Sequence, residues 1–127
     1  MYRRAPKDGQ LLFELSYAYN ALRRTADAER VLVKAVKDLP RDFFINREYA
    51  YLLLNLQQHD KAIAQYKHCI EICPKADMTQ KSEAAFNLAQ AYNQSGDATN
   101  AATWFDNARQ WAPEGSPVAE FFKNKTR

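Results

Sequence analysis

Apolar residues recur along the chain at the three- and four-residue spacing of amphipathic helices, in successive stretches of about 13 residues. Polar residues and proline separate these stretches. The longest apolar run, YAYLLLNL at 49–56, is far shorter than the ~18 residues that a membrane-spanning helix requires. Glycine occurs only three times in 127 residues, and alanine and leucine are abundant, which favours helices over strands. The pattern predicts an all-α protein.

The hydrophobic pattern repeats with a period of 34 residues. Pro6, Pro40 and Pro74 are 34 residues apart, and Pro113 follows 39 residues later. Each proline ends a helix, because it lacks an N–H donor and keeps the preceding residue out of the α region. Small residues recur where two helices must approach closely, namely Ser16, Ala28, Ala50, Ala62, Ala89 and Ala101, with Leu32, Tyr66 and Phe105 filling the space behind them. One helix pair cannot bury its apolar face alone, so successive pairs must stack.

This order of large and small positions resembles the tetratricopeptide repeat, an antiparallel helix pair that recurs in arrays. The resemblance covers roughly residues 9–115, and AAFNLAQAYNQSGDATNAATWFDNARQWAP is the clearest match. It implies a right-handed superhelical α-solenoid of antiparallel helix pairs. Asn46 departs from the pattern, since a large apolar residue is usual there, and we expect it to weaken a contact. Arg23 and Gln57 also depart, because they take the turn position that Gly96 occupies in the last repeat.

The repeat register divides the chain into five segments. They are 1–8, the tail of a truncated preceding repeat; 9–42 and 43–76, the first two repeats; 77–115, a third repeat with five extra residues at its start; and 116–127, a C-terminal capping helix. The first segment leads us to expect a piece of a longer tetratricopeptide repeat protein. An irregular natural N-terminus is the alternative.

The five extra residues, DMTQK at 77–81, carry Asp77 and Gln80 at the spacing of a capping box. We therefore expect a helix that starts near Met78, and a flexible loop is the alternative. Further on, Ser116 and Pro117 have the residue types of an N-cap and a first helical position. The helix that follows would turn its apolar stripe inward, with Val118, Phe121 and Phe122 on that stripe.

The stretch KHCIEICP at 67–74 places two cysteines four residues apart beside His68. Cys69 falls at the register of Ala35 and Ala108, which is a small buried position, and free cysteine behaves there as a small hydrophobe. A structural zinc site needs four ligands, and His68 lies about 100° around the helix from Cys69. We expect structural cysteines, with no metal and no cofactor. Phosphate-binding loops and catalytic motifs are also missing, which indicates a protein that is not an enzyme.

The formal net charge of +3 is small, and the only basic clusters are Arg3–Arg4 and Arg23–Arg24. This balance argues against nucleic acid and anionic membranes as partners. The opening residues MYRRAPKDG contain no hydrophobic stretch of the kind found in a secretory signal. The composition is compatible with both the cytoplasm and the periplasm, so it leaves the localisation open.

The resemblance implies that the first helix of each pair lines a concave groove that binds a peptide or a partner protein. The candidate groove residues are Phe13, Tyr17 and Asn20 in the first repeat, Phe44, Arg47 and Tyr51 in the second, and Phe86, Gln90 and Asn93 in the third. Rings would bury apolar anchors of the ligand, and amides would hold its backbone. For the three phenylalanines, packing between neighbouring helices is the alternative.

Family members that hold the C-terminal carboxylates of heat-shock chaperones use a clamp of Lys, Asn, Asn, Lys and Arg. The matching positions here are Phe13, Tyr17, Glu48, Glu83 and Asn87. None of them is a cation, and two carboxylates would repel such a ligand. We therefore expect a non-catalytic protein–protein interaction module without a chaperone-type carboxylate clamp. The alternative is a structural spacer, or a segment that self-associates through the ends of the solenoid.

Overall fold

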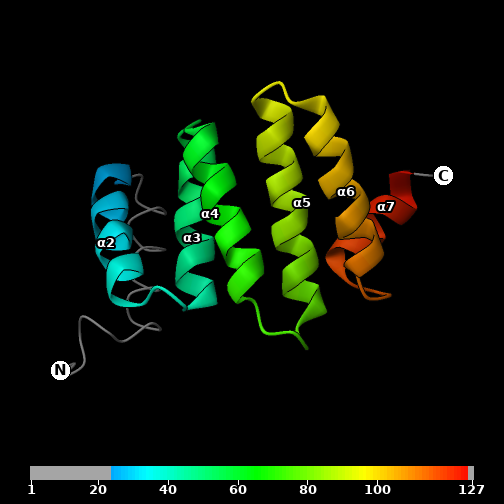
Figure 1. Cartoon of the computed structure of the whole chain (residues 1–127), viewed down its shortest axis with the longest axis horizontal. Helices are drawn as coiled ribbons and strands as arrows, with labels where there is room; N and C mark the ends of the chain where they lie inside the picture. The colour runs from blue at the N-terminus through cyan, green and yellow to red at the C-terminus, as the bar shows by residue number, and fades with distance from the viewer. Residues whose placement is uncertain (1–23, 126–127) are drawn as a thin grey trace.

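The structure, a computed structural model, describes residues 24–125, and these residues form six α-helices and no strand (Figure 1). The helices are α2 (Thr25–Asp38), α3 (Phe43–Asn55), α4 (His59–Ile72), α5 (Met78–Gln94), α6 (Ala98–Trp111) and α7 (Pro117–Lys125). None of these helices is long and apolar enough to cross a membrane. The expected segment 1–8 and residues 9–23 of the expected first repeat lie outside the described residues.

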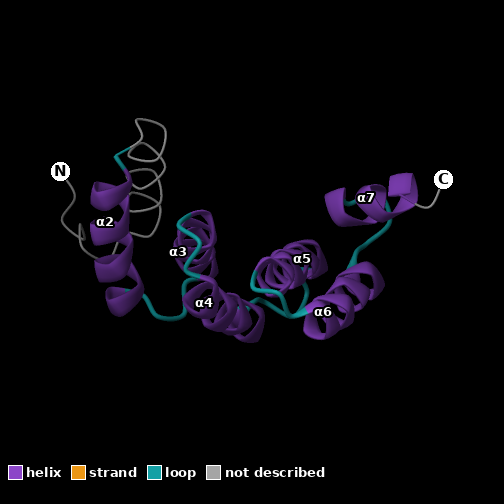
Figure 2. Ribbon diagram, turned by 90° about the horizontal axis from the view of Figure 1, so that it is seen from above, coloured by secondary structure: helices purple, strands orange, loops and turns teal. Residues whose placement is uncertain are grey.

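The helices are arranged in two layers that follow one curved path. Seen from above, α3, α5 and α7 lie on the inner side of the curve, and α4 and α6 lie on its outer side (Figure 2). Each described helix packs against its neighbour in sequence, and α5 also contacts both α3 and α7. The all-α solenoid of antiparallel helix pairs is therefore confirmed.

Small residues at the helix crossings form the core, as the periodic pattern predicts. Ala28, Ala50 and Ala62 are completely buried, and Leu32 and Tyr66 are the large buried residues behind them. The third large residue, Phe105, is only half-buried. Its ring lies 5.3 Å from the ring of Phe86 and 6.4 Å from the ring of Phe122, measured between centroids.

Aspartate side chains begin three of the described helices. The carboxylates of Asp42, Asp77 and Asp97 accept hydrogen bonds from the backbone N–H three residues ahead, each at 3.1 Å. Such N-caps satisfy donors that have no partner within the helix. The helix predicted near Met78 starts at that residue, and its 17 residues exceed the 13 of α3.

The helix α7 starts where the sequence predicts, but its apolar side chains are only partly buried. The Ser116 hydroxyl accepts a hydrogen bond from the Ala119 N–H at 3.4 Å, and Pro117 is the first residue of α7. Val118 is buried against α5 and α6 residues. Phe121, however, remains 39% exposed, so only part of the predicted inward stripe is buried.

Asn46 forms hydrogen bonds at a position where the sequence pattern predicts a weaker contact. Its side chain is 2% exposed. The Nδ2 amide donates to the carbonyl oxygens of Asp42 at 2.8 Å and Pro40 at 3.3 Å, and Oδ1 accepts from Gln65 Nε2 at 2.6 Å. The carbonyl groups around Pro40 belong to the end of α2 and the turn after it, where helical partners are lacking. The polar side chain thus replaces the usual apolar contact with hydrogen bonds that link α3 and α4 to the turn after α2.

Candidate functional site

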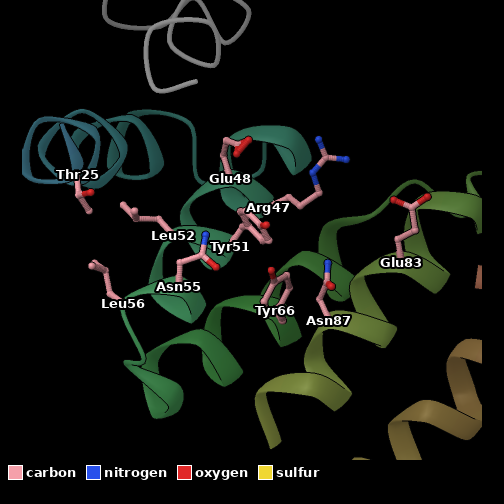
Figure 3. Close-up of a pocket in the computed structure, with 10 residues that line it drawn as sticks. All are labelled: Thr25, Arg47, Glu48, Tyr51, Leu52, Asn55, Leu56, Tyr66, Glu83 and Asn87. Atoms are coloured by element: carbon pink, nitrogen blue, oxygen red, sulfur yellow. The ribbon is translucent and has the colours of Figure 1, made fainter. Parts of the chain in front are cut away.

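A hollow of about 620 Å³ lies between α3 and α5 on the inner side of the solenoid (Figure 3). We call it the inner hollow. Its floor includes α4, and its edge includes α2 and the turn after α3. The polar and aromatic residues that line it are Thr25, Arg47, Glu48, Tyr51, Asn55, Tyr66, Glu83 and Asn87. The spacing of Glu48, Tyr51 and Asn55 on α3, and of Glu83 and Asn87 on α5, is three or four residues, so successive turns of each helix present them on one face.

The inner hollow brings together two of the predicted groove residues, Arg47 and Tyr51. Tyr51 is 49% exposed, and Phe44 nearby on α3 is 47% exposed without lining the hollow. Gln90 and Asn93 lie further along α5 and do not line it. The predicted residues Phe13, Tyr17 and Asn20 lie outside the described part of the chain.

Phe86 occupies a different place, in an aromatic cluster between α5 and α7. Its ring centroid lies 4.9 Å from that of Phe121 and 6.0 Å from that of Phe122, with the ring planes steeply inclined. Such edge-to-face pairs add to the energy of burial. Phe86 therefore contributes its ring to the packing of α7, and one side of it lines a second hollow.

This second hollow has a volume of about 240 Å³ and lies between α5 and α7. We call it the α7 pocket. Its apolar wall is formed by Phe86, Pro117, Val118 and Phe121. Glu83 and Asn87 line both the α7 pocket and the inner hollow. One turn of α5 therefore forms the ridge between a hollow lined by charged groups and a mainly apolar one.

Arg47 is already engaged by neighbouring side chains. Its Nη1 donates to Gln80 Oε1 at 2.8 Å, and its guanidinium carbon lies 5.2 Å from the centroid of the Phe44 ring. The hydrogen bond joins α3 to α5, and the ring contact is a cation–π interaction. Arg47 is thus a structural link between two helices as well as a wall of the inner hollow.

The two carboxylates of the inner hollow lack such partners. Within the described part of the chain, neither Glu48 nor Glu83 forms an ion pair or a side-chain hydrogen bond. Burial raises the pKa of Glu48 above its usual value, and the positive charge of Arg47 offsets part of that rise. A carboxylate held in this way is poorly solvated and gains from a positive or hydrogen-bonding ligand.

Tyr66 lies on the floor of the inner hollow with an unsatisfied hydroxyl group. The side chain is completely buried, and its oxygen has no hydrogen-bond partner. In Figure 3 the hydroxyl points from α4 toward Tyr51. Burial raises the pKa of Tyr66 far above its usual range, so the group stays protonated. A buried polar group without a partner costs about 1–3 kcal/mol, and such groups are uncommon in folded proteins.

Sequence reasoning assigned several of these residues to other roles. Glu48 and Asn87 entered only as positions that fail to match a carboxylate clamp, although the same register places them on the inner hollow. Asn55 lies four residues after Tyr51, and this spacing was an available signal. Tyr66 was predicted as a core residue, and its ring is one. Only the structure reveals that the hydroxyl faces the hollow.

The cysteines lie away from both hollows. Cys69 is as fully buried as Ala35 and Ala108, the residues at the same repeat position. Burial raises the pKa of the Cys69 thiol to about 12, so the thiolate that binds metals and reacts with electrophiles is scarce at neutral pH. Among residues 24–125, no three His, Cys, Asp or Glu side chains are grouped closely enough to hold a metal ion.

Comparisons with solved structures identify several proteins with a similar fold. The protein MamA AMB-1 is 22% identical with a TM-score of 0.71, and the match covers 87% of this chain and 62% of that one. The Yersinia enterocolitica type III secretion chaperone SycD, in complex with a peptide of the translocator YopD, is 16% identical with a TM-score of 0.78; coverage is 91% and 84%. The N-terminal domain of stress-induced protein-1 from C. elegans is 13% identical with a TM-score of 0.76, covering 92% and 93%.

The chain thus spans about three fifths of the MamA structure that it matches. No curated protein sequence matches it. The model of the tetratricopeptide repeat matches residues 48–75 and 82–114, which contain α4 with part of α3, and most of α5 with α6. From these matches, the helix pairing and the solenoid, the chain belongs to the tetratricopeptide repeat family.

Proposed function

We propose that this protein is an interaction module that binds an extended segment of a partner protein across the inner hollow. The observation that carries the proposal is the set of polar groups without partners in that hollow. The Tyr66 hydroxyl and the carboxylates of Glu48 and Glu83 have lost water through burial, or partial burial, without gaining a protein partner. A bound segment would supply those missing partners.

The other lining residues suit the same role. Tyr51 offers an exposed ring, and tyrosine is a frequent anchor at protein interfaces because it buries a large area with little loss of conformational freedom. The side-chain amides of Asn55 and Asn87 form no hydrogen bonds within the described residues. Each amide presents donors and an acceptor, so both are available to the backbone of an extended peptide.

The structural comparisons support this proposal at the level of the fold. SycD was solved with a peptide of its translocator bound, which illustrates that a solenoid of this kind can hold a segment of another protein. Fold alone does not decide function. The polar groups that lack partners in the inner hollow therefore support the proposed function more strongly than the fold does.

Selection of peptides from a random library tests the proposal. A phage-displayed library of 12-residue peptides is panned against the wild-type protein, and the affinity of each selected peptide is measured by fluorescence anisotropy. We expect Tyr51→Ala to weaken binding about tenfold or more, since aromatic anchors dominate peptide interfaces. Circular dichroism should show unchanged helicity, because the Tyr51 ring is half-exposed.

Val33→Ala is the matched control. Val33 is 41% exposed on α2 and does not line the inner hollow, so peptide binding should be unchanged in this variant. If no peptide is selected, or if Tyr51→Ala binds the selected peptides as well as the wild type does, the inner hollow is not a peptide site.

A further inference from the structure

The ridge between the two hollows combines a negative charge with an apolar wall. Glu83 lies on this ridge, where its half-buried carboxylate has no ion-pair partner among the described residues. On one side, Glu48 lines the inner hollow with a second unpaired carboxylate. On the other side, Phe86 and Phe121 line the α7 pocket. A ligand that crosses the ridge therefore meets opposite chemistry on its two sides.

The electrostatics of the inner hollow favour a cation. Its lining holds two carboxylates and one guanidinium group, so the formal charge is negative. The guanidinium of Arg47 is engaged by Gln80 and by the ring of Phe44. In Figure 3, Glu48 and Glu83 are drawn on opposite sides of Arg47, on α3 and α5. Partial burial lowers the effective dielectric constant, so each unpaired carboxylate attracts a positive side chain more strongly than one in bulk water would.

The α7 pocket favours an apolar side chain. Its volume of about 240 Å³ is sufficient for one large apolar side chain, and its wall consists of two phenylalanine rings, a proline and a valine. Phe121, which lines this pocket, is 39% exposed. Covering such a ring with an apolar side chain removes hydrocarbon surface from water, which is worth about 25 cal/mol per Å².

From this arrangement we infer the class of ligand: a peptide segment in which a lysine or arginine lies close in sequence to a large apolar residue. The cation would lie against Glu83 on the ridge, and the apolar side chain would fill the α7 pocket. Because the two hollows share Glu83 and Asn87, one continuous segment can reach both. This inference rests on the proposed function, and it adds the chemistry by which the site selects its partner.

The test uses the composition of the peptides selected by the full chain. We expect peptides selected by the wild type to be enriched in lysine or arginine next to leucine, isoleucine, methionine or phenylalanine. Glu83→Gln should reduce affinity for the consensus peptide about tenfold, as expected for removing one partner of a partly buried charge pair. Replacing the basic residue of the peptide by glutamine should weaken binding to the wild type but hardly affect binding to Glu83→Gln.

Glu114→Gln provides the control for charge, because Glu114 is an exposed loop residue outside both hollows. This control should leave peptide affinity unchanged. Phe121→Ala, in contrast, should weaken peptide binding, because it removes a ring from the wall of the α7 pocket. Selection of peptides that lack basic residues, or that are enriched in acidic ones, would overturn this inference and leave the inner hollow as a peptide site. Failure to select any peptide would overturn the inference and the proposed function together.

Discussion

At the scale of single residues, the departures from the repeat pattern are the informative positions. Asn46 replaces an apolar residue, and its amide donates to the carbonyl groups of Pro40 and Asp42 between α2 and α3 while its oxygen accepts a hydrogen bond from Gln65 of α4. His68 Nε2 lies 2.7 Å from the same Pro40 carbonyl oxygen. A sequence pattern records that a polar residue is present at such a position. It does not record which polar atoms the turn brings within reach, and this is why the hydrogen bonds of Asn46 could not be predicted.

Gln57 is a second departure, and here the sequence reasoning and the structure agree. Gln57 adopts a φ of 60°, and Gly96, at the same turn of the next repeat, has a φ of 91°. A left-handed conformation costs a residue with a Cβ about 1–2 kcal/mol, whereas glycine adopts it freely and loses about 0.5–1 kcal/mol of backbone entropy on folding. Glycine is therefore the better residue at both positions.

We predict opposite effects for exchanges at these two turns. Gln57→Gly should raise the free energy of unfolding by about 0.5 kcal/mol, from the difference between those two costs. Gly96→Ala should lower it by about 0.5 kcal/mol, the same difference with the opposite sign, because an added Cβ meets no atom within 4 Å and adds no further steric cost. Urea denaturation measures both values. Equal signs for the two variants would contradict this account.

At the scale of elements, local residues determine where the helices begin. The aspartate before α5 and the spacing to Gln80 predicted the start of that helix, because an N-cap acts on the nearest backbone groups. The second half of the predicted capping box did not form as the motif suggests. Gln80 Oε1 accepts a hydrogen bond from Arg47, which is 33 residues away. No local pattern contains a partner so distant, so the inserted residues could be predicted as a helix start but not as a link between α3 and α5.

Loss of the cap on α5 should be measurable. We predict that Asp77→Ala lowers the free energy of unfolding by about 1 kcal/mol, because the Gln80 N–H loses its acceptor. Asp60→Ala is the control, since Asp60 lies in the first turn of α4 and α4 has no side-chain cap. The control should change the value by less than about 0.5 kcal/mol. Equal losses in both variants would mean that the effect is one of charge rather than capping.

At the scale of the whole molecule, the repeat predicts the curved inner side of the solenoid. It predicts only some of the residues that line the hollows on that side. Register placed Arg47 and Tyr51 on the inner hollow. It could not assign Phe86, because the ring packs against α7, a helix that does not follow the repeat. It also could not reveal the unsatisfied Tyr66 hydroxyl, since satisfaction depends on atoms from several helices. Sequence periodicity thus predicts which face of a helix a residue lies on, whereas a pocket depends on how neighbouring helices pack together.

The unpaired carboxylate of Glu48 should make stability depend on pH. Burial raises its pKa in the folded state above the usual value of 4.5, so ionisation opposes folding. This penalty is absent below pH 4.5, develops as pH rises toward the folded pKa, and is complete above it. We predict that Glu48→Gln has a higher Tm than the wild type at pH 7, and that the difference disappears as pH falls to about 4.

Thermal unfolding followed by circular dichroism across this pH range provides the measurement. Glu114→Gln, which removes an exposed carboxylate in the loop before α7, should change the free energy of unfolding by less than about 0.5 kcal/mol. A Glu48→Gln variant that is less stable than the wild type at pH 7 would mean that attraction to Arg47 outweighs the cost of burial. A gain in stability would mark Glu48 as a residue better suited to a bound partner than to the free fold.

The position of α7 against α5 and α6 provides a way to detect a ligand bound in the α7 pocket. Among the described helices, α7 is the shortest, with nine residues, and it contacts only α5 and α6. In stacked-repeat proteins, stability is a sum over neighbouring units, so a short helix with few contacts opens more often than a longer one with many. A segment seated in the α7 pocket would hold this helix against α5 and reduce its opening. Slower hydrogen–deuterium exchange of the amides in α7 would then report binding without any label on the partner.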